Sequence, residues 1–159
     1  MSPRGIGFAF LAIGLAATFS FSQTKKAAAG SLVGAWKVVE ITSPNGEKNT
    51  NPQPGLYIFT QKHYSIMLVT GTKPRPKYEA ANKATDADKI ATFDAFTANS
   101  GTYTISGNVL KTRPLVAKNE FVMSGPEQES EVKIDGNTLL LTAKGGPAPG
   151  GVTKLMRVE

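Results

Sequence analysis

The feature that most restricts the fold of this chain is a series of short runs rich in β-branched and aromatic residues, which starts at residue 31. Turn residues such as Gly, Pro, Asn and Asp separate these runs, a pattern typical of antiparallel strands joined by tight connections. The chain has 159 residues, the length of one ordinary domain. With 40% hydrophobic and 19% charged residues, it is too apolar for a disordered chain. The sequence therefore predicts one mainly β domain.

The runs also predict the architecture. Eight antiparallel strands in sequence order close most readily into an up-and-down barrel, because closure leaves no exposed sheet edge. A barrel of this size is just wide enough to hold one small ligand. Asp135-Gly136-Asn137 is a strong hairpin signal between two of the strands. The expected strands are residues 32–42, 56–60, 64–70, 101–106, 108–113, 127–134, 138–143 and 152–158.

One short α-helix is expected between the third and fourth strands, over residues 85–97. Thr85 and Asp88 resemble a capping box, in which two side chains satisfy free backbone N–H groups. Asn99-Ser100-Gly101 is expected to end the helix. Three apolar residues fall on one side, so we expect this side to pack onto the rest of the protein. These residues are Ile90, Phe93 and Phe96.

Residues 1–22 have the pattern of a secretory signal peptide. Arg4 supplies a positive charge, residues 6–19 form an apolar run, and Ser20-Phe21-Ser22 favours cleavage before Gln23. The alternative is a membrane anchor, but the run is shorter than the roughly 20 residues that a spanning helix needs. We therefore expect export, either to the periplasm or by full secretion.

Residues 23–30 are expected to form a flexible leader and residues 31–159 the barrel. The chain has no Cys, so the exported domain must be stabilised by burial alone. Its net charge of +6 comes from dispersed cations, which does not favour nucleic-acid binding. His63 is the single histidine and is expected to be exposed in a turn, with axial haem ligation as the alternative. No metal site and no cofactor are predicted, because the usual zinc ligands are lacking.

Three motifs, in order along the chain, resemble those of a known family. They are Leu32-Val33-Gly34-Ala35-Trp36, Gly55-Leu56-Tyr57-Ile58-Phe59-Thr60 and Gly101-Thr102-Tyr103. On these motifs, residues 31–159 resemble the bacterial lipocalin-like domain family of calycin-type β-barrels. The resemblance implies that Gly34 and Trp36 open the first strand. It also implies that Arg157, in the last strand, packs against Trp36 as a structural pair.

The interior of the expected barrel is either a ligand pocket or a solid core, and the sequence leaves both open. Alternate positions of a strand point to the same face. Tyr57 and Tyr103 favour the pocket, because a buried phenol needs a hydrogen-bond partner that a ligand often supplies. The residues expected to line the pocket are Tyr57, Phe59, Ile66, Leu68 and Tyr103.

A polar anchor for the ligand is also predicted. Glu40 shares the phase of Trp36 and Val38, so it is expected to point inward, where a carboxylate needs a cation nearby. Lys111 and Arg113, in the strands after the helix, are the candidates for that cation. The alternative is that Glu40, near a strand end, is solvated.

Two charged stretches can each be interpreted as solvated surface or as a functional feature. Residues 73–77 alternate cations with prolines and are expected to form an extended loop. This loop is either simply solvated, or it steers an anionic ligand or contacts an anionic membrane surface. The glutamates of residues 127–131 alternate along one strand, which is typical of a face in contact with water.

Residues and resemblance together predict an exported lipocalin-like barrel that binds a small hydrophobic or amphipathic ligand in its interior. No catalytic residue is assigned. One alternative is a barrel enzyme of isomerase or cyclase type, and the other is a ligand-free barrel that contacts a protein or the cell envelope. An enzyme of that type would act through Glu40, Tyr57, Tyr103, Lys111 and Arg113.

Overall fold

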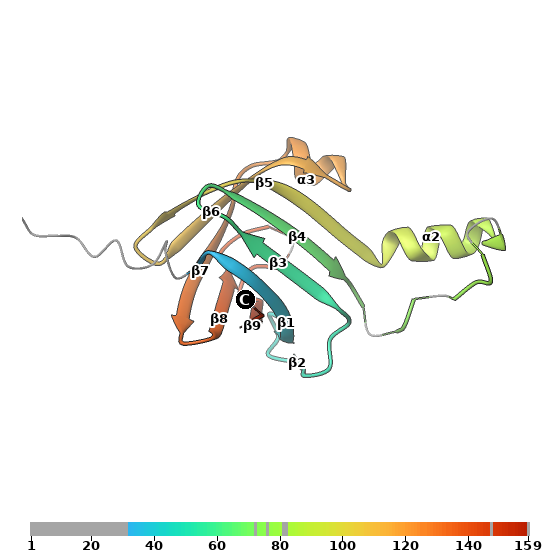
Figure 1. The fold of residues 1–159 in the computed structure, drawn as a ribbon, viewed down its shortest axis with the longest axis horizontal. Helices are drawn as coiled ribbons and strands as arrows, with labels where there is room; N and C mark the ends of the chain where they lie inside the picture. The colour runs from blue at the N-terminus through green and yellow to red at the C-terminus, as the bar shows by residue number, and fades with distance from the viewer. Residues whose placement is uncertain (1–31, 72, 76, 81–82, 147, 159) are drawn as a thin grey trace, which may run out of the picture.

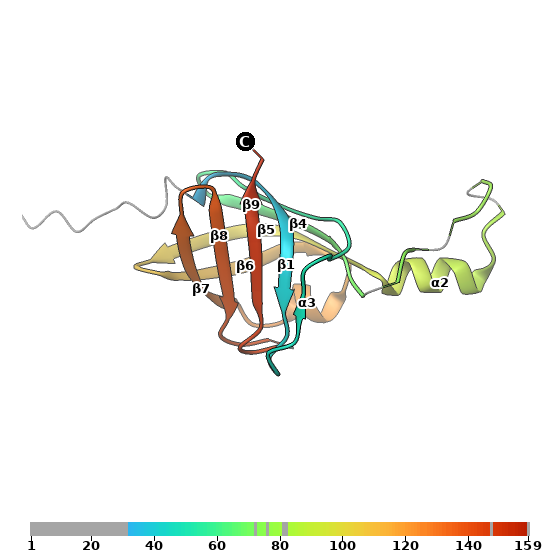
Figure 2. The same cartoon turned by 90° about the horizontal axis from the view of Figure 1, so that it is seen from below.

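A computed structural model describes residues 32–71, 73–75, 77–80, 83–146 and 148–158. The expected signal peptide and leader therefore lie outside the described residues. The described chain is a β-barrel from which helix α2 (Asp86–Asp94) projects to one side, while helix α3 (Glu120–Ser124) lies against the barrel (Figures 1 and 2). Neither of these helices is long and apolar enough to cross a membrane.

Nine strands form one antiparallel sheet in the part of the chain that is described. Strands β1 and β3 to β9 are neighbours in sequence order, and β9 pairs with β1 to close the barrel. The extra strand, β2, has two residues and pairs with the end of β1. The bounds are β1 Gly34–Thr42, β2 Lys48–Asn49, β3 Gly55–Phe59, β4 His63–Val69, β5 Phe96–Ser106, β6 Val109–Ala117, β7 Gln128–Asp135, β8 Thr138–Ala143 and β9 Val152–Arg157.

The mainly β class and the closed eight-stranded antiparallel barrel are confirmed. The expected position of the helix, between the third and fourth strands, is wrong. The structure has α2 after β4 and a second helix, α3, after β6. The unexpected strand β2 raises the number of strands before α2 from three to four. It forms because Lys48 and Asn49 pair with Thr42 and Ile41 across the turn at Ser43-Pro44-Asn45-Gly46.

Helix α2 begins as expected but ends earlier. Thr85 is its N-cap, and the reciprocal capping box with Asp88 is present. Phe96, however, is already the first residue of β5, and Asn99-Ser100-Gly101 lies inside that strand. Pairing of β5 with β4, from Val69–Phe96 to His63–Thr102, overrides the local turn preference.

The apolar side of α2 is not packed onto the barrel, which corrects a second expectation. No residue of the helix is buried, and Ile90 and Phe93 are 61% and 57% exposed. The C-terminal end of α2 is attached to the barrel through hydrogen bonds of Thr70 with the carbonyl groups of Asp94 and Ala95, and of Lys118 with that of Phe93. The helix therefore leaves its apolar residues in solvent.

Helix α3 fills a gap that the sheet leaves open. β6 and β7 pair only over Val109–Thr112 and Gln128–Glu131, so the chain between these stretches is free to form another element. Asn119 is the N-cap of α3, and its side chain accepts a hydrogen bond from the backbone N–H of Phe121. The sequence analysis missed this one-turn helix.

Gly101 permits the close approach of β5 and β6. An irregularity in the pairing places Ser100 opposite Val116 but Gly101 opposite Pro114, so Leu115 is an extra residue on β6. A Cβ atom on Gly101 would lie 2.0 Å from the carbonyl oxygen of Arg113. Only glycine fits at this position of the third motif.

Candidate functional site

One end of the barrel is filled by apolar side chains, and we call it the closed end. Trp36, Phe59 and Leu155 are fully buried there. Tyr57 and Tyr103, which the sequence places in a pocket, belong to the same buried cluster. A solid core therefore describes this end, and a ligand contact at these residues stays a prediction.

Tyr103 has a complete set of protein contacts. Its ring meets that of Phe59 edge-on, with the ring centroids 5.5 Å apart. Its hydroxyl group donates a hydrogen bond of 2.6 Å to the backbone carbonyl oxygen of Thr60. The buried phenol thus finds its partner in the turn between β3 and β4 rather than in a ligand.

Trp36 and Arg157 face each other across β1 and β9, as the resemblance implies. The guanidinium carbon lies 4.0 Å from the centroid of the indole ring. Arg157 Nη1 donates to the carbonyl oxygen of Val33 at 2.8 Å, and Trp36 Nε1 donates to that of Leu32 at 2.9 Å. Gly34 between them has a φ of +138°, a conformation that favours glycine. These contacts tie the chain entering β1 to the end of the barrel.

Ile66 and Leu68 lie further along the interior, toward the opposite end, which we call the mouth. Both are partly buried and pack against the core. Across the β4–β5 pair they stand opposite Asn99 and Thr97. The interior therefore changes from apolar to mixed as it approaches the mouth.

A cavity of about 850 Å³ opens at the mouth. This volume lies within the roughly 300–1,000 Å³ that small-molecule sites occupy. Its walls come from the end of α2, the start of β5, the segment through α3 to β7, and the β8–β9 loop. The lining residues are Phe93, Asp94, Phe96, Thr97, Ala98, Asn99, Lys118, Asn119, Phe121, Val122, Gly125, Pro126, Glu127, Gln128 and Gly146.

Three uncharged polar side chains form the inner wall of this mouth cavity. Thr97 and Asn99 share the strand phase of buried Tyr103, and Gln128 shares that of buried Val132, so all three point toward the interior. Amide groups both donate and accept hydrogen bonds. The wall can therefore orient a polar group of a ligand without requiring a charge.

Aromatic side chains form the outer rim of the cavity. Phe93 on α2 and Phe121 on α3 line it from two sides, and both are mostly exposed. Phe96 lies between them at the start of β5 and has the guanidinium group of Arg75 5.5 Å from its ring centroid. The cavity thus combines an apolar rim with a polar inner wall.

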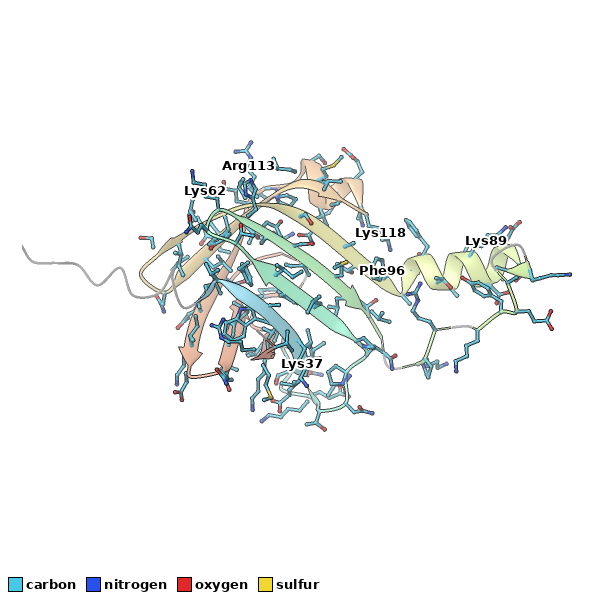
Figure 3. The ribbon with its side chains drawn as sticks, viewed as in Figure 1. Lys37, Lys62, Lys89, Phe96, Arg113 and Lys118 are labelled. Atoms are coloured by element: carbon cyan, nitrogen blue, oxygen red, sulfur yellow. The ribbon has the colours of Figure 1, made fainter. Side chains whose placement is uncertain are left out.

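Lys118 connects β6 to the end of α2. Its ammonium group donates hydrogen bonds to the carbonyl oxygens of Phe93 and Phe96 and lies 3.9 Å from the centroid of the Phe93 ring. The carbonyl groups at the end of a helix carry a partial negative charge, which favours a cation there. Figure 3 shows Lys118 and Phe96 side by side at the base of α2. Carboxylates of Asp94 and Glu127 also line the cavity, so its charge is mixed.

Two tyrosines of the apolar core, Tyr57 and Tyr64, have perturbed pKa values. Burial raises the pKa of Tyr57, and a hydrogen bond with the Thr153 side chain partly offsets this rise. Burial raises the pKa of Tyr64 to about 12, and the nearby Thr112 side chain lowers it slightly. This approach of Thr112 falls short of hydrogen-bond geometry, since Tyr64 Oη has no partner among the described residues. Both phenols are neutral at physiological pH.

The expectation that Glu40 points inward is wrong. The pairing of β1 with β9 shifts between Val38, opposite Leu155, and Glu40, opposite Lys154. This bulge adds one residue to β1 and reverses the phase after it, so Ile41 packs against the core instead. Glu40 lies near the surface, with Lys48 Nζ 4.0 Å from its carboxylate.

The expectation for Lys111 and Arg113 is also wrong. Leu110 and Pro114 are the buried residues of β6, and Lys111 and Arg113 have the opposite strand phase, so both point outward and are exposed. Figure 3 shows Arg113 on the outer surface of the barrel. Lys111 pairs with Glu129 at 2.6 Å, and this hydrogen bond, with the charge of Glu129, raises the pKa of Lys111. No polar anchor forms from these residues.

The remaining charged candidates lie at the surface. His63 is exposed at the start of β4. In the residues that the structure describes, no group of three or more His, Cys, Asp or Glu side chains could hold a metal ion. Glu131 on the outer face of β7 pairs with Lys144 at 2.6 Å.

Comparison with known proteins agrees with the barrel geometry. The family model of the lipocalin-like domain matches residues 33–151. The chain belongs to the lipocalin-like domain family. Among solved structures, a lipocalin-like protein from Bacteroides uniformis matches with a TM-score of 0.50 at 14% identity, covering 80% of this chain and 99% of that one. An uncharacterized protein from Bacteroides eggerthii matches with a TM-score of 0.47 at 12% identity, covering 79% and 98%. No curated protein matches this sequence.

In this lipocalin-like barrel, sequence reasoning missed most residues of the mouth cavity. Phe93 and Phe96 were predicted only as part of the apolar side of a helix. Asn119, a good N-cap followed by apolar residues, is the one local signal that could have revealed α3. Thr97 and Asn99 carried no such signal, because their inward direction depends on the extension of β5 along β4.

Proposed function

We propose that this lipocalin-like protein binds a small, mainly hydrophobic or amphipathic ligand, and that the binding site is the mouth cavity. The observation that carries the proposal is the cavity of about 850 Å³, with its aromatic rim and uncharged polar inner wall. A lipocalin-like barrel is consistent with this role.

The lining favours a ligand with one polar group and an apolar body. Burial of apolar area contributes roughly 25 cal/mol per Å² and would supply most of the affinity. Asn99 and Gln128 would hydrogen-bond the polar group and fix its orientation. Lys118 lines the cavity together with Asp94 and Glu127, so charges of both signs are available to the polar group.

Titration with an environment-sensitive fluorescent fatty acid tests the proposal. We expect saturable binding to the protein and at least a roughly tenfold weaker Kd for Asn99→Trp, because the indole occupies the space into which the amide points. Thr104→Trp, on the exposed side of the same strand, is the matched control and should bind as the unchanged protein does. Circular dichroism establishes that each variant is folded.

An unchanged Kd for folded Asn99→Trp would place the probe elsewhere and refute the site. Native mass spectrometry of gently purified protein gives an independent result. A mass excess that disappears on denaturation supports a bound ligand, and the released molecule gives its class. No mass excess together with no probe binding would contradict the function.

We also propose that the protein is exported. The apolar run of residues 6–19 and the small side chains before Gln23 support this. After expression of the full chain in a bacterium, mass spectrometry of the periplasmic fraction should find a protein that begins at Gln23. Full-length protein of 16.8 kDa confined to the cytoplasm would contradict export.

A further inference from the structure

Exposed apolar side chains gather around the mouth of the barrel. They belong to three elements, the C-terminal half of α2, the end of β6, and α3, and each is between 39% and 78% exposed. At the closed end, by contrast, the exposed large apolar residues of the described chain are Met156 and Val158. We call the group at the mouth the mouth collar, and it consists of Ile90, Phe93, Leu115, Val116, Phe121 and Met123.

The mouth cavity does not account for this collar. Phe93 and Phe121 line the cavity, but Ile90 and Leu115 do not. A bound ligand could cover the first two side chains and would leave the others in water. Large apolar side chains that are exposed together at one end of a soluble protein point to an interaction site. The collar therefore indicates a partner in addition to the ligand.

The charges near the collar favour an anionic partner. The whole chain carries a net charge of +6. Lys73, Arg75 and Lys77, in the loop that leads to α2, are exposed and form no ion pair with any described residue. On α2 itself, Asp86 is paired with Lys89 at 2.9 Å, and Asp88 is held in the capping box. Asp88 keeps its negative charge in the capping box, and the loop also carries the carboxylate of Glu79. With three cations against one carboxylate, the loop of residues 73–79 still presents a net positive charge beside the collar.

The shape of the collar favours a lipid surface over a folded protein as its partner. Its side chains project from three separate elements, and those of Phe93 and Phe121 line the cavity from two of them. Figure 2 shows α2 directed away from the barrel. A second protein, or a second copy, would need about 800 Å² of well-packed surface on each side. A lipid interface needs no such fit, since apolar side chains insert singly while cations remain among the headgroups.

We propose that the mouth collar docks the barrel on an anionic lipid surface, with the mouth cavity facing the lipid. Carboxylates at the same end, those of Asp94, Glu120 and Glu127, oppose deep insertion, so contact is limited to the collar side chains and the cations beside them. This docking does not depend on the identity of the cavity ligand.

Co-sedimentation with lipid vesicles tests the proposal on residues 23–159. Residues 1–22 are omitted because their apolar run would itself bind lipid, and every described strand and core residue lies between residues 32 and 158. We expect binding to vesicles of mixed phosphatidylglycerol and phosphatidylcholine, weaker binding to phosphatidylcholine alone, and a decrease with added salt.

The double variant Ile90→Ser and Leu115→Ser separates docking from ligand binding, because neither residue lines the cavity. We expect its partition onto anionic vesicles to fall at least tenfold, with the fluorescent fatty acid still bound as before. Met156→Ser, which removes an exposed apolar side chain at the closed end, should leave the partition unchanged.

Three results would overturn docking by the collar. They are no binding to anionic vesicles, equal binding by the double variant, and an equal loss in Met156→Ser. Sedimentation velocity tests whether a second copy of this chain, and not a lipid surface, covers the collar. A dimer that the double variant converts to monomer, with no vesicle binding, would make the collar a contact between two copies of this chain.

Discussion

Replacing Arg157 tests whether the contact at the closed end stabilises the fold. In the structure, the guanidinium group lies over the Trp36 ring at 4.0 Å and donates to the Val33 carbonyl oxygen at 2.8 Å. Arg157→Met keeps the apolar stem and removes both polar contacts. Arg157→Lys keeps the charge but loses the planar group that stacks and donates.

The magnitude follows from these two contacts. A hydrogen bond from a charged donor contributes about 1.5–3 kcal/mol, and a cation–π contact about 0.5–2 kcal/mol. Arg157 is only partly buried, so solvent reduces both values. We expect Arg157→Met to lower the free energy of unfolding by about 2–3 kcal/mol and Arg157→Lys by roughly half as much.

Urea unfolding measures this change. Trp36 is the only tryptophan, so its fluorescence reports directly on the closed end, and far-UV circular dichroism reports on the sheet. With a slope of about 1–3 kcal/mol per M, the Arg157→Met midpoint should fall by about 0.7–3 M. Met156→Ala, at the exposed neighbouring position, should stay within about 0.5 kcal/mol. A loss below about 0.5 kcal/mol in Arg157→Met would refute the stabilising role.

Three further predictions concern the rest of the barrel. Gly101→Ala should lower the free energy of unfolding by about 3 kcal/mol in urea, because its Cβ would meet the Arg113 carbonyl oxygen at 2.0 Å; Gly145→Ala, with open space around it, should change little. The raised pKa of Tyr64, about 12, means that its contribution is fully present below pH 10 and lost as the pH rises toward 12. At about pH 8, Tyr64→Phe should therefore have the same urea midpoint as the unchanged protein. Between about pH 8 and pH 11 the variant should lose less stability than the unchanged protein, and a larger loss in the variant would contradict the prediction. Lys118→Met should speed amide hydrogen exchange in α2 with no change in the barrel strands, and unchanged exchange in α2 would show that this lysine does not hold the helix.

Local patterns in the sequence were enough for part of this structure. Asp135-Gly136-Asn137 connects β7 and β8 as expected, because Gly136 adopts a φ of +54° that the turn requires. The capping box at Thr85 is present because it involves only residues three apart. The contact between Trp36 and Arg157 came from the family resemblance.

The mouth cavity could not be derived in the same way. Thr97 and Asn99 point inward only because β5 starts at Phe96 and pairs with β4 from Phe96 to Thr102. Lys118 reaches the end of α2 across the β5–β6 pair, a contact between residues more than twenty positions apart. Strand propensity does not encode such pairings, which depend on closure of the barrel.

Local patterns predicted the β class, the number of long strands and most of their centres, because alternation of apolar residues is a local property with a period of two. The outward direction of the charged candidates depended on strand pairing, which local patterns do not contain. One extra residue in β1 reverses the phase at Glu40, and burial of Leu110 and Pro114 leaves Lys111 and Arg113 on the outer face of β6. Since a shift of one residue moves a side chain to the other face, a single bulge decides what a strand offers to the interior.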